Sequence, residues 1–100
     1  MKVLRLPDVD AEALEAAQYY AAIDHKLGLR LGQEFEATVE RIRHFPLGWK
    51  PIDVNLRQCG VKGFPYVVVY LVRSDEIVIV AFANTHRRPN YWRSRLEKPI

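Results

Sequence analysis

The sequence predicts an α+β fold: an N-terminal strand, a helical hairpin packed on an antiparallel sheet of about four strands, and a short C-terminal helix. Two observations lead to this prediction. Apolar side chains recur at helical spacing through residues 11–45. Residues 53–83 instead contain short β-branched and aromatic runs separated by turn residues. The order of one strand, two helices and three antiparallel strands places the helical pair on one face of the sheet.

The length and composition are those of one domain spanning residues 1–100. A chain of 100 residues lies below the size at which domains divide, and 49% hydrophobic residues suffice for a core. The single cysteine, Cys59, cannot form an internal disulfide and has no metal-ligand spacing around it. No stretch has the length to span a bilayer, and the N-terminus lacks the apolar core of a signal peptide. We therefore expect a cytoplasmic protein without a metal or other cofactor.

The first strand and the first helix are predicted near the N-terminus. Lys2–Leu6 alternates in the manner of a strand, and Pro7 ends it. Asp8 or Asp10 is expected to cap the first helix, because a carboxylate accepts hydrogen bonds from the free N–H groups there. Gly28 is expected to interrupt the helical pattern and to separate the two helices.

The second helix has one apolar face and one charged face, and Pro46 and Gly48 end it. The residues expected on its apolar face are Leu31, Phe35, Thr38, Val39, Ile42 and Phe45. Two such helices joined by a short break form a hairpin with one side to bury.

The second half of the chain is predicted to form the rest of the sheet. Trp49–Ile52 is interpreted as a loop and Asp53–Cys59 as a strand. Tyr66–Val72 and Glu76–Ala83 form a hairpin around a tight turn at Ser74–Asp75. Both hairpin strands are apolar at nearly every residue. They are therefore either covered on both faces or leave one face for a partner.

The last quarter of the chain carries the clearest functional signal. The apolar strand stops at Asn84, and residues 85–93 bring a histidine, several arginines and two aromatic rings to one edge, with a short helix from about Asn90. Cations and flat rings suit a phosphate-bearing polymer. Residues 46–100 contain nine basic and four acidic side chains, against six and eight in residues 1–45. This basic half favours an anionic partner, although a mildly basic domain without one fits the charge equally well.

An ordered set of features spans nearly the whole chain. It comprises the early strand, the helix with Phe35, Val39 and Ile42, Phe45-Pro46 followed by Gly48, Arg57, Phe64-Pro65-Tyr66 before Val67–Tyr70, and Ile77–Ile79 leading to His86–Pro89 and Tyr91-Trp92. This set resembles the RelE/ParE superfamily of bacterial toxins from type II toxin–antitoxin modules, and the ParE-like branch in particular. The resemblance implies a growth inhibitor that a cognate antitoxin neutralises. An acidic, amphipathic antitoxin segment would suit the basic edge.

The resemblance leaves two mechanisms open. RelE-like members are ribosome-dependent mRNA endoribonucleases, and on that reading the catalytic residues would be His86, Arg57, Arg87 and Tyr91. His86 titrates closest to neutrality and would be the acid or base. Arg57 and Arg87 would hold phosphate, and Tyr91 or Trp92 would stack on a base.

ParE-like members instead inhibit DNA gyrase without chemistry of their own, and the same edge is then a binding surface. The residues predicted to bind the target or nucleic acid are Arg57, Lys62, Arg73, His86, Arg87, Arg88 and Trp92. We favour this reading, because Asp53–Gly63 offers only Arg57 and Lys62 where nuclease relatives carry several closely spaced cations. A degenerate interaction domain without toxicity is a further alternative.

These assignments depend on one arrangement in space: His86, Arg57 and Arg87 must lie at the same edge. Each residue also has a purely structural reading. His86 fits the end of a strand equally well, and Arg57 fits an exposed cross-strand pair, which contributes roughly 0–1 kcal/mol. Trp92 fits a core position that closes the sheet.

Overall fold

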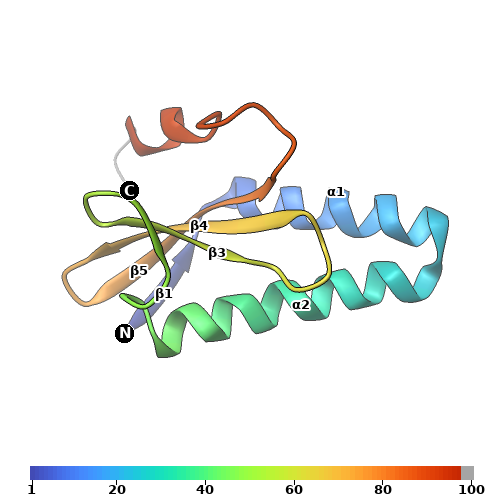
Figure 1. The fold of residues 1–100 in the computed structure, drawn as a ribbon, viewed down its shortest axis with the longest axis horizontal. Coiled ribbons are helices and arrows are strands. Elements are labelled where there is room, and N and C mark those ends of the chain that lie inside the picture. Colours follow the sequence, from blue (N-terminus) through green and yellow to red (C-terminus); the bar gives the residue numbers. More distant parts are fainter. Residues whose placement is uncertain (98–100) are drawn as a thin grey trace.

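The computed structural model describes residues 1–97. Residues 98–100, which complete the predicted domain, lie outside the described residues. The elements in chain order are β1 (Lys2–Arg5), α1 (Pro7–Ile23), α2 (His25–His44), β2 (Lys50–Asp53), β3 (Leu56–Gly60), β4 (Tyr66–Arg73), β5 (Glu76–Asn84) and the 3-10 helix η1 (Arg93–Glu97). Figure 1 shows the two helices running antiparallel beside the sheet, and the C-terminal segment lying away from α2.

The five strands form one mixed sheet in the order β1-β5-β4-β3-β2. Strand β1 pairs in parallel with β5, from Lys2 opposite Glu76 to Arg5 opposite Ile79. The other neighbours are antiparallel. The α+β class is confirmed, with one strand more than predicted and one parallel pairing. That pairing was not visible in the sequence because its partners are more than 70 residues apart.

The break between the helices lies at Asp24, not at Gly28 as predicted. Asp24 has an extended backbone (φ −156°, ψ 124°), and its side chain accepts a hydrogen bond from the N–H of Lys26 at 3.0 Å. Gly28 lies inside α2, where it lets the helices approach closely. A Cβ there would come within 2.7 Å of the carbonyl oxygen of Ala17 and of the Ala21 Cβ.

Two other details of the helices differ from the prediction. Leu6, not Asp8 or Asp10, precedes α1, and its aliphatic side chain cannot accept a capping hydrogen bond. Pro7 opens the helix, where its missing N–H has no cost. The apolar face of α2 is buried as predicted except for Phe45, which follows the helix and is 66% exposed.

The segment predicted as a loop at Trp49–Ile52 contains β2, and the predicted strand Asp53–Cys59 is interrupted. Val54 and Asn55 form the turn between β2 and β3, and Asn55 adopts the left-handed conformation (φ 61°). Asparagine tolerates that conformation better than most residues do. The alternation that suggested one strand is therefore the end of β2, a turn, and β3.

The β4–β5 hairpin is confirmed, and an irregularity in it explains its continuous apolar pattern. The register shifts between Val69 and Tyr70, so that Val80 is an extra residue on β5. Ile77 and Ile79 face the helices before the shift, and Phe82 faces them after it. Without the extra residue, Phe82 would point to the other side of the sheet.

The sheet has an apolar cluster on each face. The helix-side cluster joins Phe35 and Ile42 of α2 to Tyr70 and Phe82 of the sheet. On the opposite face, Trp92 and Leu96 of the C-terminal segment cover side chains of β3, β4 and β5. The predicted C-terminal helix is a short 3-10 helix that begins at Arg93. It is part of the segment that covers this face of the sheet.

Candidate functional site

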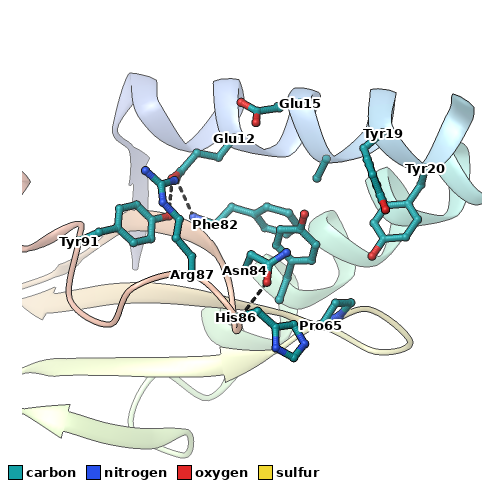
Figure 2. Close-up of a pocket in the computed structure, with 12 residues that line it drawn as sticks. Glu12, Glu15, Tyr19, Tyr20, Pro65, Phe82, Asn84, His86, Arg87 and Tyr91 are labelled. Carbon is teal, nitrogen blue, oxygen red and sulfur yellow. Dashed lines mark hydrogen bonds and ion pairs between the residues drawn. The ribbon is translucent and has the colours of Figure 1, made fainter.

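The segment after β5 is turned back towards α1 by local hydrogen bonds. The His86 N–H donates to Asn84 Oδ1 at 2.8 Å, and the Arg87 N–H donates to the Asn84 carbonyl at 3.1 Å. Thr85 bonds the carbonyl of Pro65 through both its N–H (2.8 Å) and its hydroxyl (3.2 Å). These bonds fix the direction of the loop, so Arg87 reaches α1 while the His86 ring points away from α1, on the side of Pro65 (Figure 2).

One carboxylate on α1 holds this returning segment. Glu12, whose side chain is only 14% exposed, accepts two hydrogen bonds from Arg95 (2.9 and 3.0 Å) and one from the Phe82 N–H (3.1 Å). The Tyr91 hydroxyl also donates to Glu12, and Arg87 Nη1 lies 3.6 Å from it. We call Glu12, Tyr91, Arg95 and the Phe82 N–H the Glu12 clamp. Bidentate, charge-assisted bonds of this kind are the strongest polar contacts in proteins.

The sequence contains a signal for Glu12 that its interpretation missed. Glu12 lies near the start of α1, where acidic residues are favoured in any case. Its neighbours on the buried side of α1 are Val9, Ala13 and Ala16, at the i, i+3, i+4 spacing of one face. An acidic residue inside an apolar stripe indicates a buried partner, and here the partner is Arg95.

The hydroxyl of Tyr91 and one face of its ring, which a catalytic tyrosine would need free, are both engaged by other residues. Burial, reinforced by the hydrogen bond to Glu12, raises the pKa of Tyr91 well above its ordinary value. One face of its ring is covered by the Arg87 guanidinium, 3.6 Å from the ring centroid. Tyr91 is therefore held neutral and enclosed, with its hydroxyl already donating.

Two hollows flank this wall of Arg87 and Tyr91, and both residues line each of them. The aromatic groove, of about 740 Å³, runs along α1. Its walls include Tyr19, Tyr20, Tyr66 and Phe82, with Glu15 and His86 at its rim. The second hollow, of about 400 Å³, lies on the other face of the sheet. We call it the basic groove, and its lining includes Lys50, Ile52, Gln58, Val67, Val69, Ala83, Arg87, Arg88 and Trp92.

The structure gathers some of the predicted site residues in the returning loop. His86, Arg87 and Arg88 are exposed there, and Tyr91 follows them. Trp92 is only 5% exposed and packs in the sheet core, which fits its structural reading. Its ring edge still contributes to the basic groove.

Arg57, Lys62 and Arg73 do not line either groove, so their role in target binding stays a prediction. Arg57 pairs across the sheet with Tyr70, which faces the helices, and its guanidinium donates to the Trp49 carbonyl at 2.8 Å. Lys62 is exposed in the β3–β4 turn.

Arg73 pairs with Glu76 at 2.7 Å at the far end of the hairpin. That end lies roughly 25 Å along the strand from Asn84, at about 3.3 Å per residue. Sequence alternation alone could not reveal these separations, because it does not say which face of the sheet a strand presents.

Within residues 1–97, no group of three His, Cys, Asp or Glu side chains is arranged to hold a metal ion. No helix in the same range is long and apolar enough to cross a membrane.

Comparison with known proteins identifies the family. The family model described as the ParE toxin of the type II toxin–antitoxin system parDE matches residues 6–89. The chain belongs to this family. It is therefore the toxin of a toxin–antitoxin system, and a cognate antitoxin is its partner. The match includes Glu12 and the His86–Arg88 loop but stops before Tyr91 and Arg95.

A solved structure agrees with the fold of this ParE-family toxin. A chain described as the chromosomal ParDE TA system from P. aeruginosa superposes with a TM-score of 0.69 at 15% sequence identity. The alignment covers 86% of this toxin and 97% of that chain. No curated protein sequence matches the toxin.

Proposed function

We propose that this ParE-family toxin arrests growth by binding DNA gyrase, and not by cleaving RNA. The observation that carries the proposal is that Arg57 and Tyr91, two of the four residues a nuclease would need, are engaged by other groups of the protein. Attack by a 2′-hydroxyl requires a base, a cation and an acid around one phosphate. Arg57 lies on the helix side of the sheet, and the Tyr91 hydroxyl is engaged by Glu12. His86, Arg87 and Tyr91 line the aromatic groove and Arg57 does not, so with the Tyr91 hydroxyl engaged only His86 and Arg87 are left to act on one phosphate.

Inhibition by binding does not require a base, a cation and an acid around one phosphate. It requires an exposed surface of suitable shape and charge, and the basic groove beside Arg87 and Tyr91 supplies one. Gyrase lies in the cytoplasm, in agreement with the location expected from the sequence. Ribosome-dependent cleavage and a non-toxic interaction domain are the competing functions.

The antitoxin requires a surface of its own, and the aromatic groove fits it. Tyr19 is 63% exposed, and Tyr20 meets it edge to face at 5.1 Å between ring centroids. Tyr66 stacks on Phe82 at 4.6 Å on the sheet side of the groove. An amphipathic antitoxin helix laid in the groove would bury these rings.

Three assays with purified toxin separate the functions. We expect loss of supercoiling when the toxin is incubated with gyrase and plasmid, and intact message when it is incubated with translating ribosomes. Cleaved message with unaffected supercoiling would contradict the proposal. Expression that leaves growth unaffected would favour the non-toxic domain.

His86→Ala sharpens the distinction. A nuclease that uses His86 as acid or base would lose cleavage by roughly 10²–10⁴-fold, whereas a binding toxin would lose only a small part of its potency. His25→Ala, an exposed histidine at the start of α2, is the matched control.

A further inference from the structure

We propose that the toxin binds its target through the basic groove, and that this groove accepts an acidic protein segment bearing an aliphatic side chain. This inference rests on the proposed function, in which the toxin binds a macromolecule without chemistry. It goes beyond that function by assigning the contact surface and the chemistry of the partner.

The floor of the groove is aliphatic and belongs to the rigid sheet. Val69 pairs with Gln58, which pairs with Lys50, so these three side chains form a row on the face opposite the helices. Val67 and Ala83 form the next row. Ile52 of β2 and Val67 are partly exposed. A hollow of about 400 Å³ over such a floor has room for an aliphatic side chain and its neighbours.

The charges around this floor are positive. Lys50 on β2 and Arg88 in the loop after β5 are both exposed, and both line the groove. Arg87 adds a third cation, although its guanidinium is shared with Glu12 and Tyr91. The described lining contains no aspartate or glutamate. Cations beside a low-dielectric floor attract anions more strongly than the same cations on an open surface, so the fitting partner is acidic.

The chemistry of the floor favours a protein over a nucleic acid. Surfaces that bind single strands use open aromatic faces as stacking platforms. In this groove Trp92 is 5% exposed, and the face of Tyr91 is covered by Arg87. Aliphatic side chains of a protein match Ile52 and Val67 better than a base does.

Side-chain insertion also fits the groove better than addition of a strand at β2. Pro51 lies in that edge strand and has no N–H to donate, and the register is irregular between Pro51 and Asp53. Both features disfavour strand pairing at an edge.

The test is the double variant Lys50→Glu/Arg88→Glu. We expect its potency in growth arrest, and in gyrase inhibition, to fall at least tenfold, while its affinity for the antitoxin changes less than threefold by calorimetry. Lys2→Glu/Lys26→Glu makes the same change of charge at exposed positions outside the groove and should retain potency. Tyr19→Ala, in the aromatic groove, should show the reverse pattern, with weaker antitoxin binding and unchanged arrest.

The outcomes are distinguishable. Unchanged potency of Lys50→Glu/Arg88→Glu overturns the inference, and so does an equal loss in the Lys2→Glu/Lys26→Glu control. Loss of antitoxin affinity without loss of potency would assign the groove to the antitoxin. Binding of a labelled oligonucleotide that the double variant abolishes would assign it to nucleic acid.

Failure of the proposed function gives a different result. If the wild-type toxin arrests growth but leaves gyrase active, the gyrase proposal fails, and the growth comparison still decides whether the groove contacts the target. Absence of any arrest by the wild type overturns both. Lys50→Gln/Arg88→Gln, with circular dichroism and a thermal melt, replaces the charge reversal if that variant does not fold.

Discussion

The two faces of the sheet are covered in different ways. On one face, α1 and α2 bury a continuous apolar cluster in which Phe35 meets Phe82 edge to face at 5.0 Å between ring centroids. On the other face, the cover is a short segment anchored by Trp92 and by ion pairs to carboxylates, of which Glu12 makes the most bonds and Asp8 and Asp53 the weaker contacts. The helix layer is stabilised by many interchangeable apolar contacts. The C-terminal cover depends on a few specific polar bonds between residues about 80 positions apart.

This difference has a mechanical consequence. Loss of one contact in the helix layer weakens the whole fold, because its members are part of the shared core. Loss of the clamp frees only the segment after β5, which also forms one wall of both grooves. The region that carries the proposed function is thus the region with the fewest independent attachments.

The largest expected effect comes from breaking the clamp. Glu12→Ala leaves the mostly buried Arg95 with only the exposed Asp8, 3.6 Å away, and should lower the free energy of unfolding by about 3 kcal/mol. Trp92→Ala removes the apolar anchor of the same segment and should lower it by about 3–5 kcal/mol. If both act by docking one segment, the double variant loses at least about 1 kcal/mol less than the sum. Urea unfolding at neutral pH measures all three values.

The control for this cycle lies on the other face. Phe35→Ala combined with Trp92→Ala should be additive, since the two residues belong to different apolar clusters. Additivity of Glu12→Ala with Trp92→Ala would show that the cover is not a single unit and would remove the contrast between the faces.

A smaller effect is expected where the helices touch. Gly28→Ala forces a Cβ to within 2.7 Å of the Ala17 carbonyl oxygen. The resulting displacement costs about 1–3 kcal/mol and outweighs the gain of about 1 kcal/mol in helix propensity. The net change should be a loss of about 1 kcal/mol. Gly32→Ala, in the same helix with nothing within 4 Å of its Cβ, should instead gain up to about 1 kcal/mol.

Thermal and urea unfolding of both glycine variants test the packing of the helix layer. An equal increase in the free energy of unfolding of the two variants would mean that α1 and α2 move apart at little cost. The helix layer would then be no more rigid than the C-terminal cover.

The smallest effect is the alkaline response of Tyr70. Burial raises the pKa of Tyr70 to about 12, and its hydroxyl donates to the Pro46 carbonyl at 2.6 Å. The folded state therefore keeps this proton above pH 10, where the unfolded chain releases it. The contribution of Tyr70 to the free energy of unfolding is fully present below pH 10 and is lost as the pH rises towards 12. At pH 10.5 the loss from this group is about 0.8 kcal/mol.

Tyr70→Phe should remove this share of the loss, which urea titrations at pH 8 and pH 10.5 would detect. Tyr91→Phe provides the comparison with the other face, because the pKa of Tyr91 is raised as well. An unchanged pH dependence in Tyr70→Phe would show that its hydroxyl ionises in the folded protein at its ordinary pKa.

The parts of the fold that sequence predicted are those that local patterns encode. The apolar face of α2 and the hairpin around Ser74–Asp75 follow from spacing and turn chemistry. The end of α1 was misplaced, because Gly28 is a contact glycine and not a helix terminator. The strand β2 was missed because Pro51 disfavours strand pairing, although an edge strand tolerates it.

The candidate site was predictable only as far as it is continuous in sequence. His86, Arg87 and Arg88 come from one loop and were found together. Lys50 was missed because its place in the basic groove depends on pairing across β3. Glu12 and Arg95 are 83 positions apart, and no local pattern connects them.

The parallel pairing of β1 with β5 also sets when the toxin becomes dangerous to the cell that makes it. Residues 2–5 leave the ribosome first, but their partners at 76–79 emerge more than 70 residues later. At about 5–20 residues per second, this delay is on the order of 4–15 s. During that interval the nascent chain lacks β5, which lies between β1 and β4, and a chain released before residue 76 cannot assemble this sheet. The toxin is therefore harmless until translation is nearly complete.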